Sequence, residues 1–173
     1  CEYCRFEEVA YLILYKDLPN TIQLRKFEKE EKNNRELSKN LYSIIKKMPK
    51  KSHPMDVART AVSVMGLEDK ETPDSSPEAN MRKAIRILAK TPTALAAFYR
   101  VRKGQKILKP KKNLNMAENF FYMCFGKVPQ KEIVKAFDVS LILYAEHGFN
   151  VSTFTARTIT SSLSDIHGAI TGA

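Results

Sequence analysis

The residues best suited to chemistry in this sequence are its three histidines, at positions 53, 147 and 167. His147 stands directly before Gly148, at the end of an apolar stretch, and Asn150 and Ser152 follow at the start of a further predicted helix. Unpaired N–H groups at a helix N-terminus attract anions, and a histidine can donate to a carboxylate or carbonyl oxygen. The segment can therefore bind an anion, although its spacing is also typical of a histidine that caps a helix C-terminus.

The other two histidines and the cysteines are weaker candidates for a chemical role. His53 directly precedes Pro54, which favours a structural role in a helix-opening turn, and His167 has few polar neighbours in the sequence. No pair of histidines has the four-residue spacing of a helical metal site. Cys1 and Cys4 form a CxxC without a second pair, and Cys124 lies far away in an apolar stretch. We therefore expect neither a metal site nor a redox site.

The charge balance is strongly basic, with 29 Lys and Arg against 19 Asp and Glu and a formal net charge of +10. Such a charge is compatible with nucleic acid, an acidic membrane or a small anionic ligand as partner. The two densest lysine clusters, residues 46–51 and 103–112, stand beside Pro and Gly. We interpret them as solvated loops. A basic helical module that binds nucleic acid remains an alternative of another class.

The composition predicts one globular domain, because 173 residues with 43% hydrophobic content can form a substantial core. The sequence lacks an apolar run of about eighteen residues and a leader peptide, so we expect a soluble protein and no membrane partner. Three cysteines in a chain of this size suit a reducing compartment, for which we take the cytoplasm.

The hydrophobic spacing predicts helices throughout and shows no alternating strand segments. The fold class is therefore all-α, a layered globular bundle of several helices. The helices are expected at about residues 7–15, 20–33, 36–48, 52–66, 76–104, 115–125, 131–146 and 153–164.

Two of these helices carry detailed expectations. In the helix over residues 52–66, Ser52 is the predicted N-cap, Gly66 the stop, and Met55, Ala58, Val62 and Met65 the buried stripe. In the helix over residues 76–104, a kink or break is predicted at Thr91–Pro92, because proline removes a backbone donor and clashes with the preceding turn.

Four segments in order resemble the citrate synthase family. They are Phe6–Pro19, Ser52–Ser63, Ala117–Gly126 and Leu141–Arg157, and the last contains His-Gly-Phe-Asn-Val-Ser at 147–152. Members of this family condense an acyl-CoA with an oxo-dicarboxylate by acid–base chemistry and need neither a metal nor another cofactor. The resemblance implies that His147 binds oxaloacetate, and that Asn150 and Ser152 support the catalytic region.

The resemblance also implies that no catalytic residue lies in this chain. The family's enol-stabilising histidine belongs to a Gly-Pro-x-His-Gly-Gly segment that would follow Ala173, and the catalytic aspartate comes later still. We therefore expect residues 1–173 to be part of the large, helical domain of a longer enzyme, with the small domain outside this chain. Taken alone, the chain is expected to be inactive.

Two features of the substrate and the assembly stay open. Tyr144-Ala-Glu-His147 resembles 2-methylcitrate synthases as well as citrate synthases, so both acetyl-CoA and propionyl-CoA are candidate substrates alongside oxaloacetate. Family members pair through helices that correspond to Met55–Met65 and Met81–Tyr99, which implies a homodimer. Core packing within one chain explains the same apolar stripes, and a non-catalytic dimerisation module remains a further alternative.

Overall fold

The computed structural model describes residues 3–146 and 148–173, and every regular element among them is a helix, which confirms the all-α prediction. The prediction missed a short last helix and started the third helix too early, since Ser38 caps it and Lys39 begins it. The elements are α1 (Phe6–Tyr15), α2 (Thr21–Asn34), α3 (Lys39–Lys47), α4 (Pro54–Glu68), α5 (Pro77–Arg102), α6 (Met116–Phe125), α7 (Lys131–Ala145), α8 (Val151–Ser161) and α9 (Ile166–Gly172).

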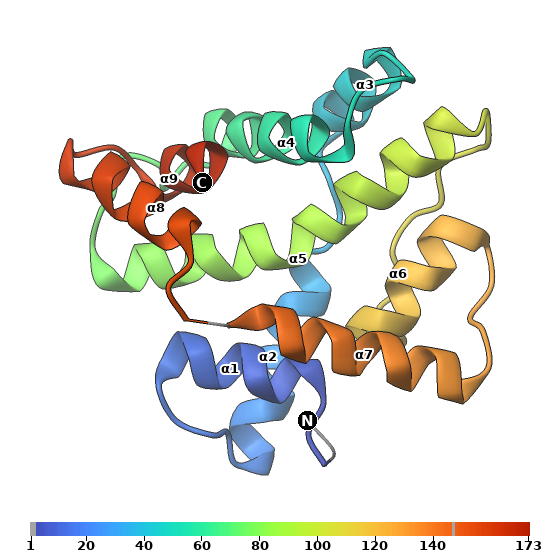
Figure 1. Ribbon diagram of the computed structural model, residues 1–173, viewed down its shortest axis with the longest axis horizontal. Coiled ribbons are helices and arrows are strands. Elements are labelled where there is room, and N and C mark those ends of the chain that lie inside the picture. The colour runs from blue at the N-terminus through green and yellow to red at the C-terminus, as the bar shows by residue number, and fades with distance from the viewer. Residues whose placement is uncertain (1–2, 147) are drawn as a thin grey trace.

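Helix α5 is the centre of the fold, and it packs against α2, α3, α4, α6 and α9. Figure 1 shows it crossing the whole molecule, with α4, α8 and α9 on one side and α1 and α7 on the other. Its 26 residues include ten buried ones, spread along nearly its full length. Burial on this scale stabilises a helix far more than intrinsic propensity does, so the neighbours of α5 hold it in place.

Of the kink or break predicted at Thr91–Pro92, the break is absent, because α5 continues through Pro92. Thr91 donates its hydroxyl to the carbonyl of Ile87 at 2.7 Å, within the turn that the proline disturbs. Ala89 and Ala94, on either side of the proline, are 1% and 0% exposed. A break would pull these buried residues out of the core, so packing outweighs the roughly 3 kcal/mol that an interior proline costs.

The expectations for α4 were partly wrong. The N-cap is His53, whose Nδ1 accepts from the backbone N–H of Met55 at 3.2 Å, and not Ser52. Met55 is 65% exposed, and the buried residues are Val57, Ala61, Val62 and Met65. The core-facing stripe therefore begins two residues later than predicted, because α4 must face α5 and α9 at the same time.

Gly66 does not stop α4, which continues to Glu68. It marks instead the point where α9 lies closest to α4. A Cβ placed on Gly66 would lie 2.8 Å from the Cβ of His167, which is shorter than ordinary carbon contacts. Glycine is required here for the close approach of another helix and not for its backbone freedom.

One buried ion pair ties a loop to the helices. Arg35 donates Nε and Nη2 to the two carboxylate oxygens of Glu31 at 2.7 and 2.6 Å, and both side chains are almost fully buried. Nη1 of Arg35 also donates to the carbonyls of Lys111 and Leu114, at 3.0 and 2.8 Å. Arg35 thus fastens the loop between α5 and α6 onto the end of α2.

We predict that Gly66→Ala destabilises the protein by about 1–3 kcal/mol, although alanine is the better helix former, because the added methyl group overpacks the contact with His167. Urea denaturation gives the measurement. Ser63→Ala, an exposed change on the same helix, is the control and should be neutral or slightly stabilising. Equal effects of the two changes would contradict the proposed close contact.

We further predict that Arg35→Met costs about 3–5 kcal/mol, because it leaves the Glu31 carboxylate buried without its partner. The free energy of unfolding of Arg35→Met, Glu31→Gln and the double variant forms a mutant cycle. The double variant should lose much less than the sum of the single losses. Arg59→Met, which breaks an exposed pair with Asp56, should cost less than about 1 kcal/mol.

Candidate functional site

The predicted site segment, residues 146–152, connects the end of α7 to the start of α8 (Figure 1). His147 lies outside the described residues, so its two interpretations, anion ligand or helix cap, both remain predictions. The flanking residues are described. Helix α7 ends at Ala145, Glu146 is extended with φ −154°, and α8 begins at Val151.

The backbone turns sharply just after position 147. Gly148 and Phe149 both have positive φ, 66° and 44°, and the N–H of Gly148 donates to the carboxylate of Glu146. A left-handed conformation costs a non-glycine residue about 1–2 kcal/mol. Phe149 adopts it while its ring is fully exposed, so no packing of that ring within the described residues offsets the cost.

Asn150 and Ser152 act at the start of α8. Asn150, and not Ser152 as expected, is the N-cap, and its Oδ1 accepts from the N–H of Ser152 at 2.7 Å. The Ser152 hydroxyl donates to the carbonyl of Ala173 at 3.0 Å. These two residues therefore fix the first turn of α8 against the end of α9, whereas their role in supporting a catalytic region stays a prediction.

The surface around this segment is apolar and open. None of the described side chains of α8 is buried, and Tyr144, Val151 and Phe154 are all more than two-thirds exposed. Helix α8 packs mainly against α9. Single exposed apolar residues are ordinary, but a contiguous group of them marks a surface that usually contacts something else.

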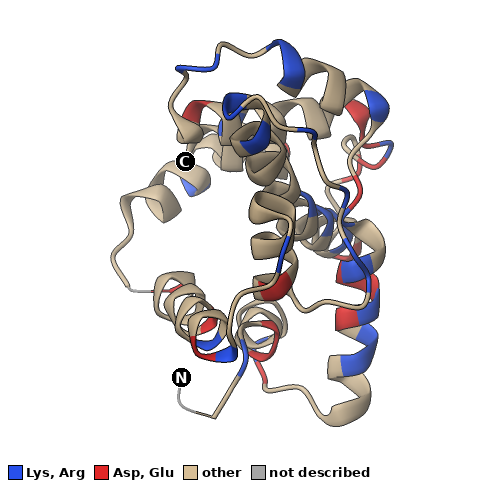
Figure 2. Ribbon diagram, turned by 90° about the vertical axis from the view of Figure 1, so that its right-hand side faces the viewer, with Lys and Arg blue, Asp and Glu red and all other residues tan. Residues whose placement is uncertain are grey.

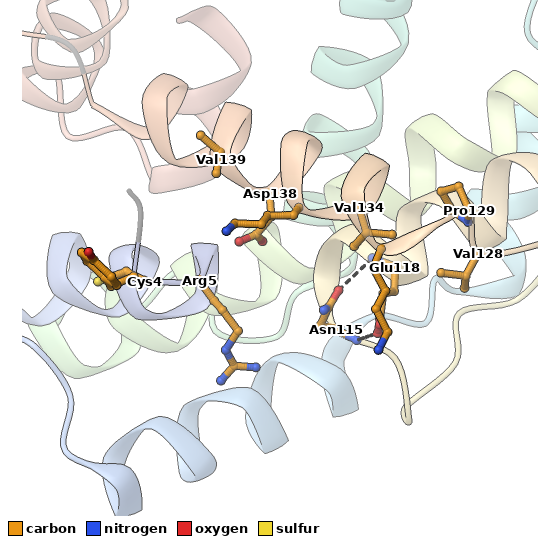
Figure 3. Close-up of a pocket in the computed structure, with 12 residues that line it drawn as sticks. Cys4, Arg5, Asn115, Glu118, Val128, Pro129, Val134, Asp138 and Val139 are labelled. Carbon is orange, nitrogen blue, oxygen red and sulfur yellow. Dashed lines mark hydrogen bonds between the residues drawn. The ribbon is translucent and has the colours of Figure 1, made fainter.

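A pocket of about 300 Å³ lies elsewhere, between the start of α1, α6 and α7 (Figure 3). Three of its polar side chains bind the starts of helices. Asn115 and Glu118 exchange hydrogen bonds at 2.8 and 3.0 Å, and Asp138 accepts from the N–H of Phe6 at 3.2 Å. Burial raises the pKa of Asp138. These three side chains therefore connect the helices that surround the pocket.

Arg5 also borders this pocket, and Figure 3 shows its guanidinium extending toward α2. There it pairs with Glu28 at 2.7 Å. The pairing occupies the charge that could otherwise have attracted an anionic ligand into the pocket.

His167 is the polar residue that the sequence interpretation undervalued. Its side chain is buried between α4 and α9, with Nε2 3.8 Å from Asp69 and Nδ1 3.5 Å from Asp165. Burial lowers the pKa of the imidazole despite these two carboxylates. The neighbouring Asp165, which caps α9 by accepting from two backbone N–H groups, was the available sequence signal.

A buried cation, Lys83, lies nearby. Lys83 is fully buried in α5 and donates its ammonium group to the carbonyl of Asp74. Asp69 pairs with Arg86 through two hydrogen bonds of 2.8 and 3.0 Å. These contacts connect the loop between α4 and α5 to both helices and to α9. They organise the fold and are far in sequence from residues 146–152.

The cysteines show no reactive arrangement in the described part of the chain. Cys4 and Cys124 are free, and burial raises the pKa of the Cys124 thiol to about 11. Residues 3–146 and 148–173 contain no cluster of three or more His, Cys, Asp or Glu able to hold a metal. Within the same residues, no helix is both long and apolar enough to cross a membrane.

We predict that stability falls as the pH drops below about 6.5, the ordinary pKa of histidine. The unfolded chain takes up a proton at that pH, whereas buried His167, with its lowered pKa, does so only at a lower pH. The loss is complete below the folded-state pKa. Urea midpoints between pH 8 and 5 give the measurement. His167→Gln should flatten the slope in this window, and an unchanged slope would contradict the assignment.

We also predict that Asn150→Ala loosens the start of α8, because it removes the acceptor for the Ser152 N–H; such caps contribute about 0.5–2 kcal/mol. Hydrogen exchange of the first amides of α8 is the sensitive measurement, since α8 is little buried. Asn150→Asp preserves the acceptor and should retain protection. Unchanged exchange in Asn150→Ala would show that the cap does not hold this helix.

The whole chain, residues 1–173, matches a family model described as citrate synthase, C-terminal domain. A 2-methylcitrate synthase of Mycobacterium tuberculosis is 46% identical over 170 residues, which cover 98% of this chain and 43% of the relative. A citrate synthase of Mycolicibacterium smegmatis is 45% identical over 170 residues, which cover 98% of this chain and 45% of the relative. The chain spans less than half the length of these curated relatives.

A solved structure shows the same arrangement of helices. It is a citrate synthase from the thermophilic archaeon Thermoplasma acidophilum, in a ternary complex with carboxymethyl coenzyme A and oxaloacetate. The two chains are similar with a TM-score of 0.92 at 25% identity, over 98% of this chain and 44% of that chain. The likeness therefore extends over nearly the whole of this chain.

Proposed function

Because the chain belongs to the citrate synthase family, we propose that it forms the helical part of an enzyme that condenses an acyl-CoA with oxaloacetate. The observation that carries the proposal is the family match over all 173 residues. Support for the two substrates comes from the archaeal relative, whose complex holds oxaloacetate and a coenzyme A derivative. No cofactor other than the coenzyme A thioester is required.

In the proposed reaction a base removes a proton from the acyl carbon next to the thioester. The resulting enolate attacks the keto carbon of oxaloacetate, whose oxygen takes up a proton, and water then hydrolyses the new thioester to release coenzyme A. His147 would bind oxaloacetate by donating hydrogen bonds to its carboxylate and carbonyl oxygens. Negative charge develops on that carbonyl oxygen in the transition state, so a positioned donor accelerates the step.

The role proposed for Asn150 and Ser152 is to position this donor. Asn150 caps α8 and Ser152 ties its first turn to Ala173. The left-handed backbone at Gly148 and Phe149 turns the chain between His147 and the helix. Together these features would hold the start of α8 in one place relative to a bound oxo-acid, so that little reorganisation is needed during the reaction.

The proton-abstracting half of the site is proposed to lie in polypeptide beyond these 173 residues. Two observations support this proposal. The chain covers only 43% and 45% of the two curated relatives, and the apolar face of α8 is exposed. Residues 1–173 would then be part of a large helical domain, and a separate small domain would complete the active site.

The identity of the acyl group is the finer question. The two relatives are named for different activities and are 46% and 45% identical to this chain, so overall identity does not separate acetyl-CoA from propionyl-CoA. We propose acetyl-CoA as the substrate and propionyl-CoA as the alternative. One methylene group changes the free energy of binding in a pocket by only about 1–3 kcal/mol, so a few side chains would decide between acetyl-CoA and propionyl-CoA.

We propose a homodimer through the outer surfaces of α4 and α5. Met55 supports this, since it is 65% exposed on α4. Most of the apolar residues of α5 between Met81 and Tyr99 are buried within the chain itself, so only a part of the expected stripe is available. We also place the protein in the cytoplasm, where free cysteines such as Cys4 and Cys124 stay reduced.

The function is tested by measuring the release of free coenzyme A. The full-length protein that contains this sequence is mixed with oxaloacetate and either acetyl-CoA or propionyl-CoA. We predict turnover with at least one thioester, and a loss of about 100-fold or more in kcat/KM for His147→Gln, as expected when a transition-state donor is removed. The 173-residue chain alone should show no turnover.

His53→Asn is the matched control, because asparagine retains a cap acceptor at the start of α4. It should keep full activity. Full activity of His147→Gln would refute the proposed role of that residue, and turnover by the isolated chain would refute the placement of the catalytic groups outside it.

A further inference from the structure

Phe149 has a backbone conformation that helix geometry does not explain. Three non-glycine residues in the described part of the chain have φ in the left-handed region, Lys16, Phe149 and Leu163. Lys16 is the C-cap of α1 and Leu163 follows the C-cap of α8, and left-handed residues commonly end helices at such positions. Phe149 ends no helix, since α7 has ended at Ala145 and Asn150 caps α8. Strain of this kind is typical of functional sites.

The side chain of Phe149 adds a second cost. Its ring is fully exposed, so no contact within the described residues offsets either the left-handed φ or the exposure of an aromatic ring to water. Glycine would adopt the same φ without strain, as it does at Gly148. Burial of a phenyl ring contributes more free energy than a left-handed φ costs. A partner that covers the ring would therefore account for both features.

The charge of the surrounding surface indicates what kind of partner fits. From Gly148 to Ser164 the sequence holds one charged residue, Arg157. Figure 2, in which α8 lies beside the C-terminus, shows the ribbon of this helix mostly in tan. Oxaloacetate carries two carboxylates and coenzyme A carries phosphates, whereas the acyl group between them in the reaction is uncharged. An aromatic ring on an almost uncharged surface fits the acyl group best.

The proposed condensation brings the acyl group close to this turn. The new bond joins the acyl carbon next to the thioester to the keto carbon of oxaloacetate, and reacting atoms approach within about 3–3.5 Å before they bond. His147, the proposed ligand of that keto group, precedes Phe149 by two residues, which span at most about 7 Å of chain. We propose that the ring of Phe149 packs against the acyl group and thereby sets the preference between acetyl-CoA and propionyl-CoA. This inference rests on the proposed condensing function.

The test compares kcat/KM for propionyl-CoA with kcat/KM for acetyl-CoA in the full-length protein. Phe149→Gly removes the ring and places at this position a residue suited to the left-handed φ. The ratio of propionyl-CoA to acetyl-CoA should fall about fourfold, which corresponds to the roughly 0.8 kcal/mol gained by burying one CH₂ group. A change in the position of the turn would affect both constants alike, so the ratio isolates the contact with the acyl group. A thioester that is not turned over is measured as a competitive inhibitor, and the change in its inhibition constant enters the comparison.

Two variants serve as matched controls. Phe149→Leu keeps an apolar side chain and should keep the ratio within about twofold of its original value. Leu163→Gly also removes an exposed apolar side chain from a left-handed residue, at the other end of α8, and should leave the ratio unchanged. Thermal unfolding of Phe149→Gly should occur at an unchanged or slightly higher temperature, because glycine relieves the left-handed strain.

The outcomes separate this inference from the proposed function. Turnover with an unchanged ratio in Phe149→Gly would overturn the contact with the acyl group while leaving condensation in place. An unchanged ratio together with a marked loss of stability would show that other parts of the polypeptide cover the ring instead. An equal fall of the ratio in Leu163→Gly would also overturn the contact. Absence of turnover by the unmodified protein with either thioester would refute condensation, and the acyl contact with it.

Discussion

The constraint on which this structure depends is that one long helix has to be buried along most of its length. Helix α5 touches α2, α3, α4, α6 and α9, so none of these can shift without exposing part of it. The continuity of α5 through Pro92 follows from the same constraint, because the residues on both sides of the proline belong to the core. The positions of α1, α7 and α8 follow indirectly, through the helices that α5 holds.

Buried polar groups then fasten the parts that apolar packing leaves loose. Arg35 holds the carbonyls of Lys111 and Leu114, and Glu7 accepts from the N–H of Met116 at 2.9 Å. The Arg35 contacts anchor an irregular segment, and the Glu7 contact ties the start of α6 to α1. Burying a charge is costly unless it is fully paired, so these residues specify where loops lie at least as much as they stabilise the fold.

Much of the fold could be predicted from local chemistry. Helices α2, α5 and α6 begin within a residue of their predicted starts at 20, 76 and 115. Their caps, Asn20, Ser76 and Asn115, bind N–H groups only two or three positions away. The errors arose where distant residues decide. The core-facing side of α4 is set by α5 and α9, and the short helix α9 packs through His167 against Gly66 of α4.

The candidate site, too, could be predicted from the sequence only in part. Its position between two helices followed from the apolar spacing and Gly148, and its proposed chemistry from family resemblance. The cap at Asn150 and the bond from Ser152 to Ala173 needed three-dimensional structure, since the latter joins residues 21 apart. The same limit holds for Lys46 of α3 and Lys106 of the loop after α5, which line one pocket only after α3 and α5 have packed.

The turn at Gly148 and Phe149 also separates two groups of packed helices. Helix α7 packs on α1 and α6, whereas α8 packs on α9, and α9 packs on α4. The two ends of the site segment are therefore carried by different groups of helices. A ligand bound at the proposed site would therefore contact both groups of helices.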